Sequence, residues 1–123
     1  MRELLRYMRS ERGTTAAEFA LVVLPFIALV LSIIFGGFLL YTNTALQYAT
    51  EAASRCWEIQ STVCTSGPVA GQYATSHYYG LVAASFTHPS AACGHTIQGS
   101  ATFPLNIGIL DLSIPLKAQA CYP

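Results

Sequence analysis

An apolar run near the N-terminus limits what this chain can fold into more than any other feature of its sequence. Residues 13–41 read GTTAAEFALVVLPFIALVLSIIFGGFLLY, and no residue from Phe19 to Thr50 carries a formal charge. As a helix, Phe19 to Tyr41 is roughly 34 Å long at about 1.5 Å per residue, and a bilayer core is about 30 Å thick. Because the run is apolar on every side, it predicts a transmembrane helix over residues 19–41 rather than an amphipathic surface helix.

The composition and the charge distribution agree with attachment to a membrane. Hydrophobic residues make up 53% of the 123 residues and charged residues only 10%, against a usual charged share of about 25%. Four of the six Lys and Arg residues precede Gly13, and after Gln60 only Asp111 and Lys117 are charged. No basic surface for nucleic acid can be built from this distribution, so we expect no direct binding of nucleic acid.

The arginines before the apolar run predict the orientation of the chain. Residues 1–12 read MRELLRYMRSER, and an excess of arginine keeps a terminus on the cytoplasmic side of a membrane. A secretory signal peptide would be followed by a cleavage site of the A-x-A type, but the chain continues TNTALQYATE after Tyr41. We therefore expect a single span that stays attached to a C-terminal part outside the cytoplasm.

The helical pattern continues past the apolar run. We expect one helix over residues 14–60, transmembrane at 19–41 and amphipathic at 42–60, with the amphipathic part packed against the C-terminal region. Pro25 lacks an N–H donor and is expected to kink or loosen this helix. The expected apolar stripe comprises Ala45, Ala49, Ala52, Ala53, Cys56 and Ile59, with Gln47, Thr50, Glu51, Ser54, Arg55 and Glu58 on the opposite face.

Residues 61–123 are expected to form a small α+β region that begins with a second helix. Ser66-Gly67-Pro68 resembles a helix start, with a capping hydroxyl and a proline in the first turn. Val69 to Phe86 is therefore the candidate for a short second helix.

The end of the chain has the pattern of an antiparallel hairpin. After a loop over residues 87–94, the stretches HTIQGSATFPL and LSIPLKAQACY alternate partly and are rich in strand-forming residues. Their prolines, Pro104 and Pro115, cannot donate to a strand ladder and require edge positions or bulges. We therefore expect a C-terminal β-hairpin that is not deeply buried.

Four cysteines follow the span, and an even number there predicts disulfides in an oxidising compartment. Cys93 precedes the first strand of the hairpin and Cys121 ends the second, so the hairpin would bring them together. Cys56 and Cys64 flank the end of the long helix, where a turn of the chain can join them. Within one unbroken helix they would be roughly 12 Å apart, too far to bond. We favour these two bridges among the three pairings that four cysteines allow.

The sequence offers little that could support catalysis or hold a cofactor. Ser85 and Ser90 lie near His88, but neighbours in sequence do not make a triad. His88, Cys93 and His95 do not have the spacing of a zinc site. There is no glycine-rich phosphate loop and no dinucleotide fingerprint. We therefore expect no enzyme activity, no cofactor and no metal.

The charge of Glu18, at the start of the apolar run, is difficult to explain if the helix is only a membrane anchor. A charged side chain at the middle of a bilayer costs about 2.5–3.5 kcal/mol on insertion scales, and less near the edge. Arg9 and Arg12 are candidate partners for its carboxylate. A place in a helix assembly, where an amine or an arginine neutralises the charge, would explain its presence, so we expect Glu18 to act in assembly.

The segment GTTAAEF followed by LVVLPFIALVLSIIFGGF resembles the class III signal region of type IV pilin-like proteins. More specifically, residues 9–41 are similar to the TadE-like family of minor pilins and pseudopilins in tight-adherence (Tad, or Flp) pilus systems. The resemblance rests on a short basic leader, a glycine, a glutamate five positions later and a proline. The family often has a second acid near the outer end of the apolar run, where this chain has Phe35-Gly36-Gly37.

The resemblance implies that a prepilin peptidase cuts the chain after Gly13 on the cytoplasmic side of the bacterial inner membrane. The cut would remove a leader peptide of residues 1–13 and leave Thr14 with a free α-amine. In a bundle of staggered helices, Glu18 of one subunit would pair with the amine of a neighbour and set the axial register. Pro25 would supply flexibility, and the C-terminal part would lie in the periplasm or in an extracellular pilus.

The implied function is structural: assembly, initiation or capping of a thin pilus that mediates adhesion, DNA uptake or surface contact. The implied partners are the prepilin peptidase, other pilin and minor pilin subunits, the inner-membrane assembly platform and membrane lipid. Two alternatives stay open, namely an uncleaved single-span protein with a partner-binding or regulatory domain, and the major pilin subunit. Major Flp pilins usually have little beyond the helix, so residues 61–123 favour the minor role.

Overall fold

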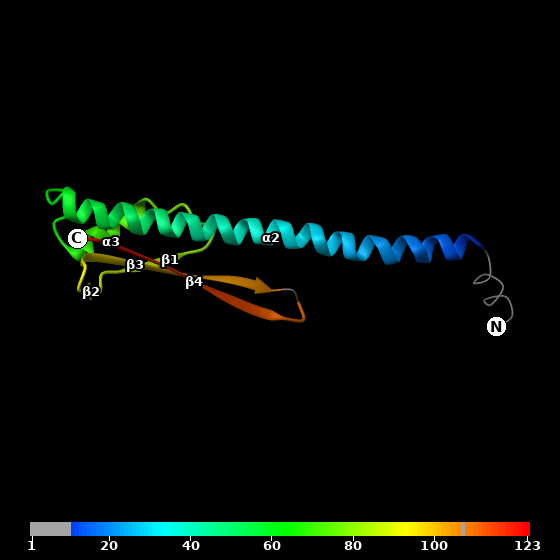
Figure 1. Cartoon of the computed structure of the whole chain (residues 1–123). Coiled ribbons are helices and arrows are strands. Elements are labelled where there is room, and N and C mark those ends of the chain that lie inside the picture. Colours follow the sequence, from blue (N-terminus) through cyan, green and yellow to red (C-terminus); the bar gives the residue numbers. More distant parts are fainter. Residues whose placement is uncertain (1–10, 107) are drawn as a thin grey trace. The chain divides into compact units, whose positions relative to one another are not determined.

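The chain forms a long helix followed by a short helix and an antiparallel sheet (Figure 1). The computed structural model describes residues 11–106 and 108–123, so residues 1–10 of the predicted leader peptide lie outside the described residues. The helices are α2 (Glu11–Ile59) and α3 (Gly67–Ser76), and the strands are β1 (Ala84–Thr87), β2 (Ser90–Ala91), β3 (Gly94–Asn106) and β4 (Asp111–Tyr122). The predicted α+β fold is confirmed.

The chain divides into two compact units, Met1–Gly37 and Phe38–Pro123. The second unit combines the segment that the sequence predicts to be amphipathic, residues 42–60, with the predicted C-terminal region, residues 61–123. This part of α2 therefore packs with the C-terminal region, as the change in its sequence pattern predicts.

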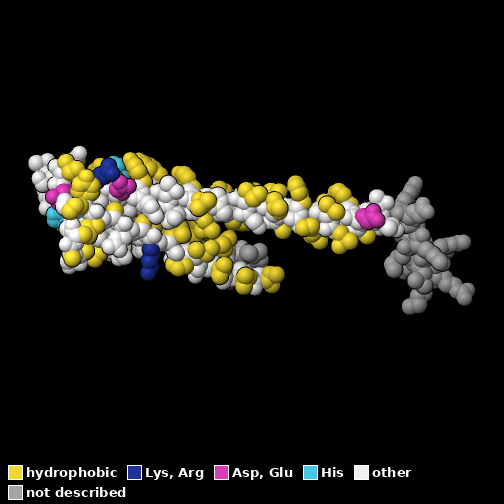
Figure 2. All heavy atoms as spheres, in the orientation of Figure 1, with side chains coloured by type: hydrophobic (Ala, Val, Ile, Leu, Met, Phe, Trp, Pro, Cys, Tyr) yellow, Lys and Arg dark blue, Asp and Glu magenta, His cyan; other side chains and the backbone are white. Residues whose placement is uncertain are grey.

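The part of α2 in the first unit presents its apolar side chains outward. Apart from Val23, its large hydrophobic side chains are exposed, from 37% for Val30 to 73% for Leu21, and Figure 2 shows hydrophobic atoms along this part of the helix. By length and composition α2 contains a candidate membrane span, with a mean hydropathy of 2.8 over 18 residues. Pro25 lies inside α2 without ending it, so the kink expected there stays a prediction.

In the second unit, α2 buries small polar side chains as well as apolar ones. Thr50 and Ser54 are 1% exposed, although the sequence pattern places them on the solvent side, and Ile59 is 66% exposed although the pattern places it in the apolar stripe. The hydroxyls of Thr50 and Ser54 donate to the carbonyls of Gln47 and Glu51, at 2.8 and 3.0 Å. Because these bonds satisfy the hydroxyls within the helix, the two side chains can be buried where the sheet approaches. The buried face comprises Thr42, Leu46, Ala49, Thr50, Ala53, Ser54 and Cys56.

Two disulfides secure the C-terminal region. Cys56 and Cys64 are bonded, with Cα atoms 5.7 Å apart, and they hold the turn by which the chain leaves α2. Within this turn the N–H of Gln60 donates to the carbonyl of Cys56, and the N–H of Cys64 donates to the carbonyl of Gln60. Cys93 and Cys121 join the residue before β3 to the end of β4, with Cα atoms 6.4 Å apart. These are the two bridges that the sequence layout favours.

The second helix begins where the sequence predicts but ends at Ser76, so the expected helix over residues 69–86 is wrong beyond that residue. Ser66 is the N-cap with an extended backbone, but its hydroxyl makes no capping hydrogen bond. At the other end, the Ser76 hydroxyl donates to the carbonyl of Tyr73 at 2.8 Å, and Nδ1 of His77 lies 2.9 Å from the same carbonyl. The remainder of the expected helix supplies β1, because β3 offers an edge with which it can pair.

β3 is the central strand of the antiparallel sheet. β4 pairs along β3 as far as Asn106, which lies opposite Asp111 at the free end of the hairpin. β1 and β2 share the other edge of β3, and the pairing of β1 extends only to Ala101. The predicted hairpin is confirmed, whereas the loop expected over residues 87–94 is wrong in part because it contains β2.

Both prolines of the hairpin lie at edges of the sheet. Pro115 lies on β4, whose outer edge pairs with no strand in the described part of the chain. Pro104 lies on β3 beyond Ala101, where the pairing with β1 has ended. The prediction of edge positions is confirmed, and its physical reason is that proline has no N–H to donate to a ladder.

The core of the second unit consists of two neighbouring hydrophobic clusters, both of which Phe86 contacts. Tyr78 packs against the second cluster, its hydroxyl donates to the carbonyl of Val82 at 2.7 Å, and burial raises the pKa of its phenol. The first cluster contains Ala53, Cys56, Cys64, Ala70, Ala74 and Ile97, and the second contains Leu46, Ala101 and Ala118.

Gly99 lies at the closest approach of β3 to α2. A Cβ atom at this position would lie 2.9 Å from atoms of Thr50 and Phe86 and 3.0 Å from Leu46. These three side chains come from both α2 and β1, so none can move aside without disturbing another contact. The absence of a side chain at Gly99 is therefore what lets the sheet lie against the small-residue face of the helix.

We expect Gly99→Val to destabilise the second unit by about 1–3 kcal/mol, the usual cost of adding methyl groups to a packed core. Urea unfolding of the full chain in detergent, followed by the fluorescence of Trp57, measures the change. Gly37→Ala is the matched control, because an added Cβ there meets nothing within 4 Å. Equal destabilisation by the two substitutions would contradict the close approach at Gly99.

The two disulfides close loops of different length, with sequence separations of 8 and 28. Loop-closure entropy predicts stabilisation of about 2.5 kcal/mol for the shorter loop and about 3.6 kcal/mol for the longer. We expect replacement of Cys93 and Cys121 by alanine to cost about 1 kcal/mol more than replacement of Cys56 and Cys64. The same urea titration compares the two double variants, and the reverse order would show that loop length does not dominate.

Candidate functional site

The residues predicted to form the cleavage site and to act in assembly lie in the first turns of α2. Gly13 and Thr14, which flank the predicted scissile bond, are helical and exposed, and so is Glu18. Thr14 and Glu18 are four positions apart, so they lie on one face of the helix. The predicted cut and the predicted register charge are thus separated by about 6 Å along the helix axis.

Glu18 lies among exposed apolar side chains rather than in a polar cluster. Phe19 and Leu21 beside it are 69% and 73% exposed. None of the residues whose side chains the structure describes forms an ion pair with Glu18, and the candidate partners Arg9 and Arg12 lie outside that set. A carboxylate in this position requires a partner whenever lipid or another apolar helix replaces water around it.

Gly36 and Gly37 leave a bare stretch of backbone on α2. An added Cβ atom at either position would meet no described atom within 4 Å. This is the place where the TadE-like family often has a second acid. In this chain the position instead permits close approach of another helix, because small residues bring helix backbones together in membranes.

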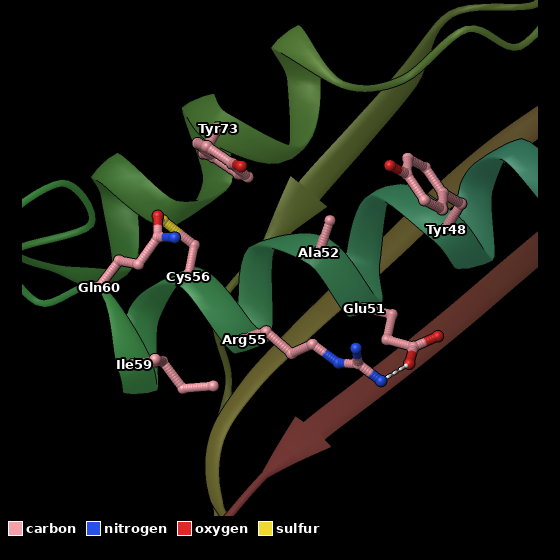
Figure 3. Close-up of a pocket in the computed structure, with 8 residues that line it drawn as sticks. All are labelled: Tyr48, Glu51, Ala52, Arg55, Cys56, Ile59, Gln60 and Tyr73. Carbon is pink, nitrogen blue, oxygen red and sulfur yellow. Dashed lines mark hydrogen bonds and ion pairs between the residues drawn. The ribbon is translucent and has the colours of Figure 1, made fainter.

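A groove of about 400 Å³ lies between α2 and α3 in the second unit (Figure 3). Tyr48 of α2 and Tyr73 of α3 border it, and the small side chain of Ala52 leaves the space between them open. Glu51 and Arg55 form an ion pair at its margin. Sequence reasoning missed this groove, and its one signal is a small residue four positions after a tyrosine on the same helix face. The lining contains no pair of nucleophile and base, so the groove has the features of a contact surface.

The histidines considered as metal ligands pack around Trp57. The ring of His95 stacks on Trp57 with centroids 4.1 Å apart, and His88 meets it edge-on at 6.2 Å. Nε2 of His95 lies 3.5 Å from a carboxylate oxygen of Glu58. Cys93, the third candidate ligand, is part of a disulfide. Across residues 11–106 and 108–123 there is no group of three side chains that could hold a metal ion.

Ser85 and Ser90, the serines near His88, both lie on strands of the sheet. Oγ of Ser85 lies 2.8 Å from Oγ of Ser100 on the neighbouring strand. Ser90 lies opposite His95 in the pairing of β2 with β3. Neither arrangement brings together the nucleophile, base and orienting acid of a triad.

Comparison with known proteins gives one finding, in the N-terminal part of the chain. No curated protein and no solved structure matches it. The model of the TadE-like protein family matches residues 13–55, which include both the apolar run and the start of the amphipathic segment. The resemblance of the sequence to the TadE-like family is therefore confirmed over these residues.

Proposed function

We propose that this chain is a structural minor pilin, or pseudopilin, of a Tad-type pilus, and that a prepilin peptidase processes it after Gly13. The observation that supports the proposal best is the TadE-like match, which begins at Gly13 and continues through α2 to Arg55. A TadE-like segment suggests association with a Tad pilus. The minor role, the processing and the partners are inferred from that segment and its chemistry.

The proposal places α2 in the bacterial inner membrane before assembly. The exposed apolar side chains between Phe19 and Leu40 match a hydrocarbon environment. The arginines before Gly13 favour a cytoplasmic N-terminus. Two disulfides after the span favour an oxidising compartment for the second unit, which is the periplasm.

In the proposed filament, the lateral contacts of α2 with other helices replace its contacts with lipid. After cleavage, Thr14 carries a free α-amine, and the Glu18 carboxylate of a neighbouring subunit pairs with that amine. Both charges are desolvated in a helix bundle, so a subunit that is out of register leaves an unpaired charge at high cost. This pair therefore sets the axial position of the subunit, while the apolar side chains supply most of the attraction.

The proposed partners are the prepilin peptidase, other pilin and minor pilin subunits, the inner-membrane assembly platform and membrane lipid. The chain is the substrate of the peptidase, and we assign it no catalytic residues and no cofactor. The second unit, Phe38–Pro123, adds a folded region to the end of the helix, whereas major Flp pilins usually have little beyond the helix. This favours a minor subunit, whose folded part initiates or caps the filament, over a major subunit that is repeated along it.

The mature N-terminus tests the proposed processing directly. In cells with an active prepilin peptidase, we expect mass spectrometry to find a chain that begins at Thr14, and in cells without the peptidase a chain that includes residues 1–13. We expect Gly13→Leu to remain uncut, because it places a branched side chain next to the scissile bond. Thr14→Ser is the matched control and should be cut normally. An uncut wild-type chain in the presence of active peptidase would instead favour a permanent single-span membrane protein.

Glu18→Gln tests the proposed register pair. Glutamine keeps the shape of the side chain but removes its charge, and a hydrogen bond to a charged group is worth about 1.5–3 kcal/mol, or roughly 10- to 100-fold in an equilibrium. We expect the variant to insert and to be cut, but its amount in sheared pili to fall by at least about tenfold. Glu51→Gln is the matched control, because Glu51 is an exposed carboxylate on the same helix that pairs with Arg55. Normal incorporation of Glu18→Gln would contradict the register role.

A further inference from the structure

The free end of the β3–β4 hairpin exposes large apolar side chains. Ile109 is 100% exposed, Leu110 58% and Leu112 49%, and Figure 2 shows hydrophobic atoms gathered at this end. The turn is nonetheless shaped by specific contacts. The N–H of Gly108 donates to Oδ1 of Asn106 at 2.9 Å, and Gly108 has a φ of 79°, which glycine adopts readily.

Two apolar side chains at the end of the paired strands share a face of the hairpin. Leu105 of β3 lies directly opposite Leu112 of β4, so the two point to the same side, while the neighbouring Asp111 points to the other. Asp111 and Lys117 are the charged residues of β4. The end of the hairpin therefore has an apolar face that includes Leu105 and Leu112, with the carboxylate of Asp111 on the opposite side.

β3 runs along α2 in the opposite direction. Ile97, early in β3, shares a cluster with Ala53 of α2, whereas Ala101, further along, shares a cluster with Leu46. The hairpin therefore extends toward the beginning of the part of α2 that belongs to the second unit, Phe38 (Figure 1).

The lengths of the two elements place the hairpin end near the end of the apolar run. Gly99 lies against Thr50, and from Gly99 to Asn106 the strand is roughly 23 Å long at about 3.3 Å per residue. From Thr50 back to Phe38 the helix is roughly 18 Å long at about 1.5 Å per residue. Even with some tilt of the strand, the hairpin end reaches the level of Phe38 to Tyr41, where the predicted span ends.

We propose that the end of this hairpin inserts Ile109, Leu110 and Leu112 into the interface of the bilayer that α2 spans. The occupant of the apolar face is lipid, because the hairpin is long enough to reach the span boundary and its large exposed side chains there, Ile109, Leu110 and Leu112, are apolar. The second unit is then held at the membrane by two elements, the helix and the hairpin, before the subunit leaves the bilayer. This inference rests on the membrane span of the proposed function, but not on the cut or on the pilus.

Single-tryptophan variants of the full chain test the insertion. In a Trp57→Phe background, tryptophan replaces Ile109, Lys117 or Phe26, one at a time. Each variant is reconstituted in vesicles of phosphatidylethanolamine and phosphatidylglycerol, with or without acyl chains that carry bromine as a quencher. Phe26→Trp reports the span, and Lys117→Trp reports an exposed position on β4 away from the turn.

We expect the brominated lipids to quench Ile109→Trp at least about twofold more strongly than Lys117→Trp, as for an insertion of about 5–10 Å. Quenching of Phe26→Trp without quenching of Ile109→Trp would overturn the hairpin insertion and leave the span intact. Absence of quenching at Phe26→Trp would overturn both. A blue shift of Ile109→Trp that grows with the ratio of protein to lipid, without lipid quenching, would assign the face to a second copy of this chain and also overturn the proposal.

A second measurement uses the unaltered chain, so its result does not depend on whether the Trp57→Phe background folds. Hydroxyl-radical labelling of the reconstituted chain compares Leu110 with Val63, which are 58% and 54% exposed. Val63 lies in the turn after α2, at the opposite end of the second unit. We expect Leu110 to be labelled at least about twofold less than Val63 in vesicles, because insertion of about 5–10 Å removes it from water. Equal labelling would overturn the proposal.

Discussion

A helix as long as α2 cannot be covered by the small region that follows it, and this constraint governs the molecule. The helix has 49 residues, and the C-terminal region buries a face of it only between Thr42 and Cys56. The apolar side chains of the first unit stay exposed within the described chain. Because such a surface is unfavourable in water, its environment must be supplied by lipid or by other helices.

The covered part of α2 uses a different kind of side chain from the uncovered part. Large aliphatic and aromatic residues dominate up to Tyr41, whereas the covered face consists mainly of alanines, threonines and a serine. Small side chains let β3 approach closely at Gly99, and the hydroxyls of Thr50 and Ser54 are satisfied within the helix. The disulfides then limit how far the covering region can open, at the turn after α2 and at the base of the hairpin. One helix thus has an N-terminal part with exposed apolar side chains and a C-terminal part that packs within a small folded unit.

Much of the architecture could be predicted from local patterns. The long helix follows from the apolar run and the pattern after it, the hairpin from alternation between turn residues, and the edge positions of Pro104 and Pro115 from the missing N–H of proline. Two predictions failed where a distant partner decided the outcome. The end of the expected second helix, from Ala84, became part of β1 because β3 offered an edge for pairing. Thr50 was buried because Gly99 of β3 came to lie against it, and Ser54 is buried one turn further along the same helix.

The sequence by itself determined the membrane-compatible run, the position of Glu18 near its start, the glycine before Thr14 and the TadE-like character of residues 13–55. These depend on composition and spacing along one chain, so no tertiary contact is needed to recognise them. Only the tertiary structure decided which face of α2 is covered, where the groove between Tyr48 and Tyr73 lies, and that the apolar hairpin end extends beside α2 toward Phe38. Those features depend on the register and direction of strands packed against a helix. Contacts between residues far apart in the sequence determine that register and direction.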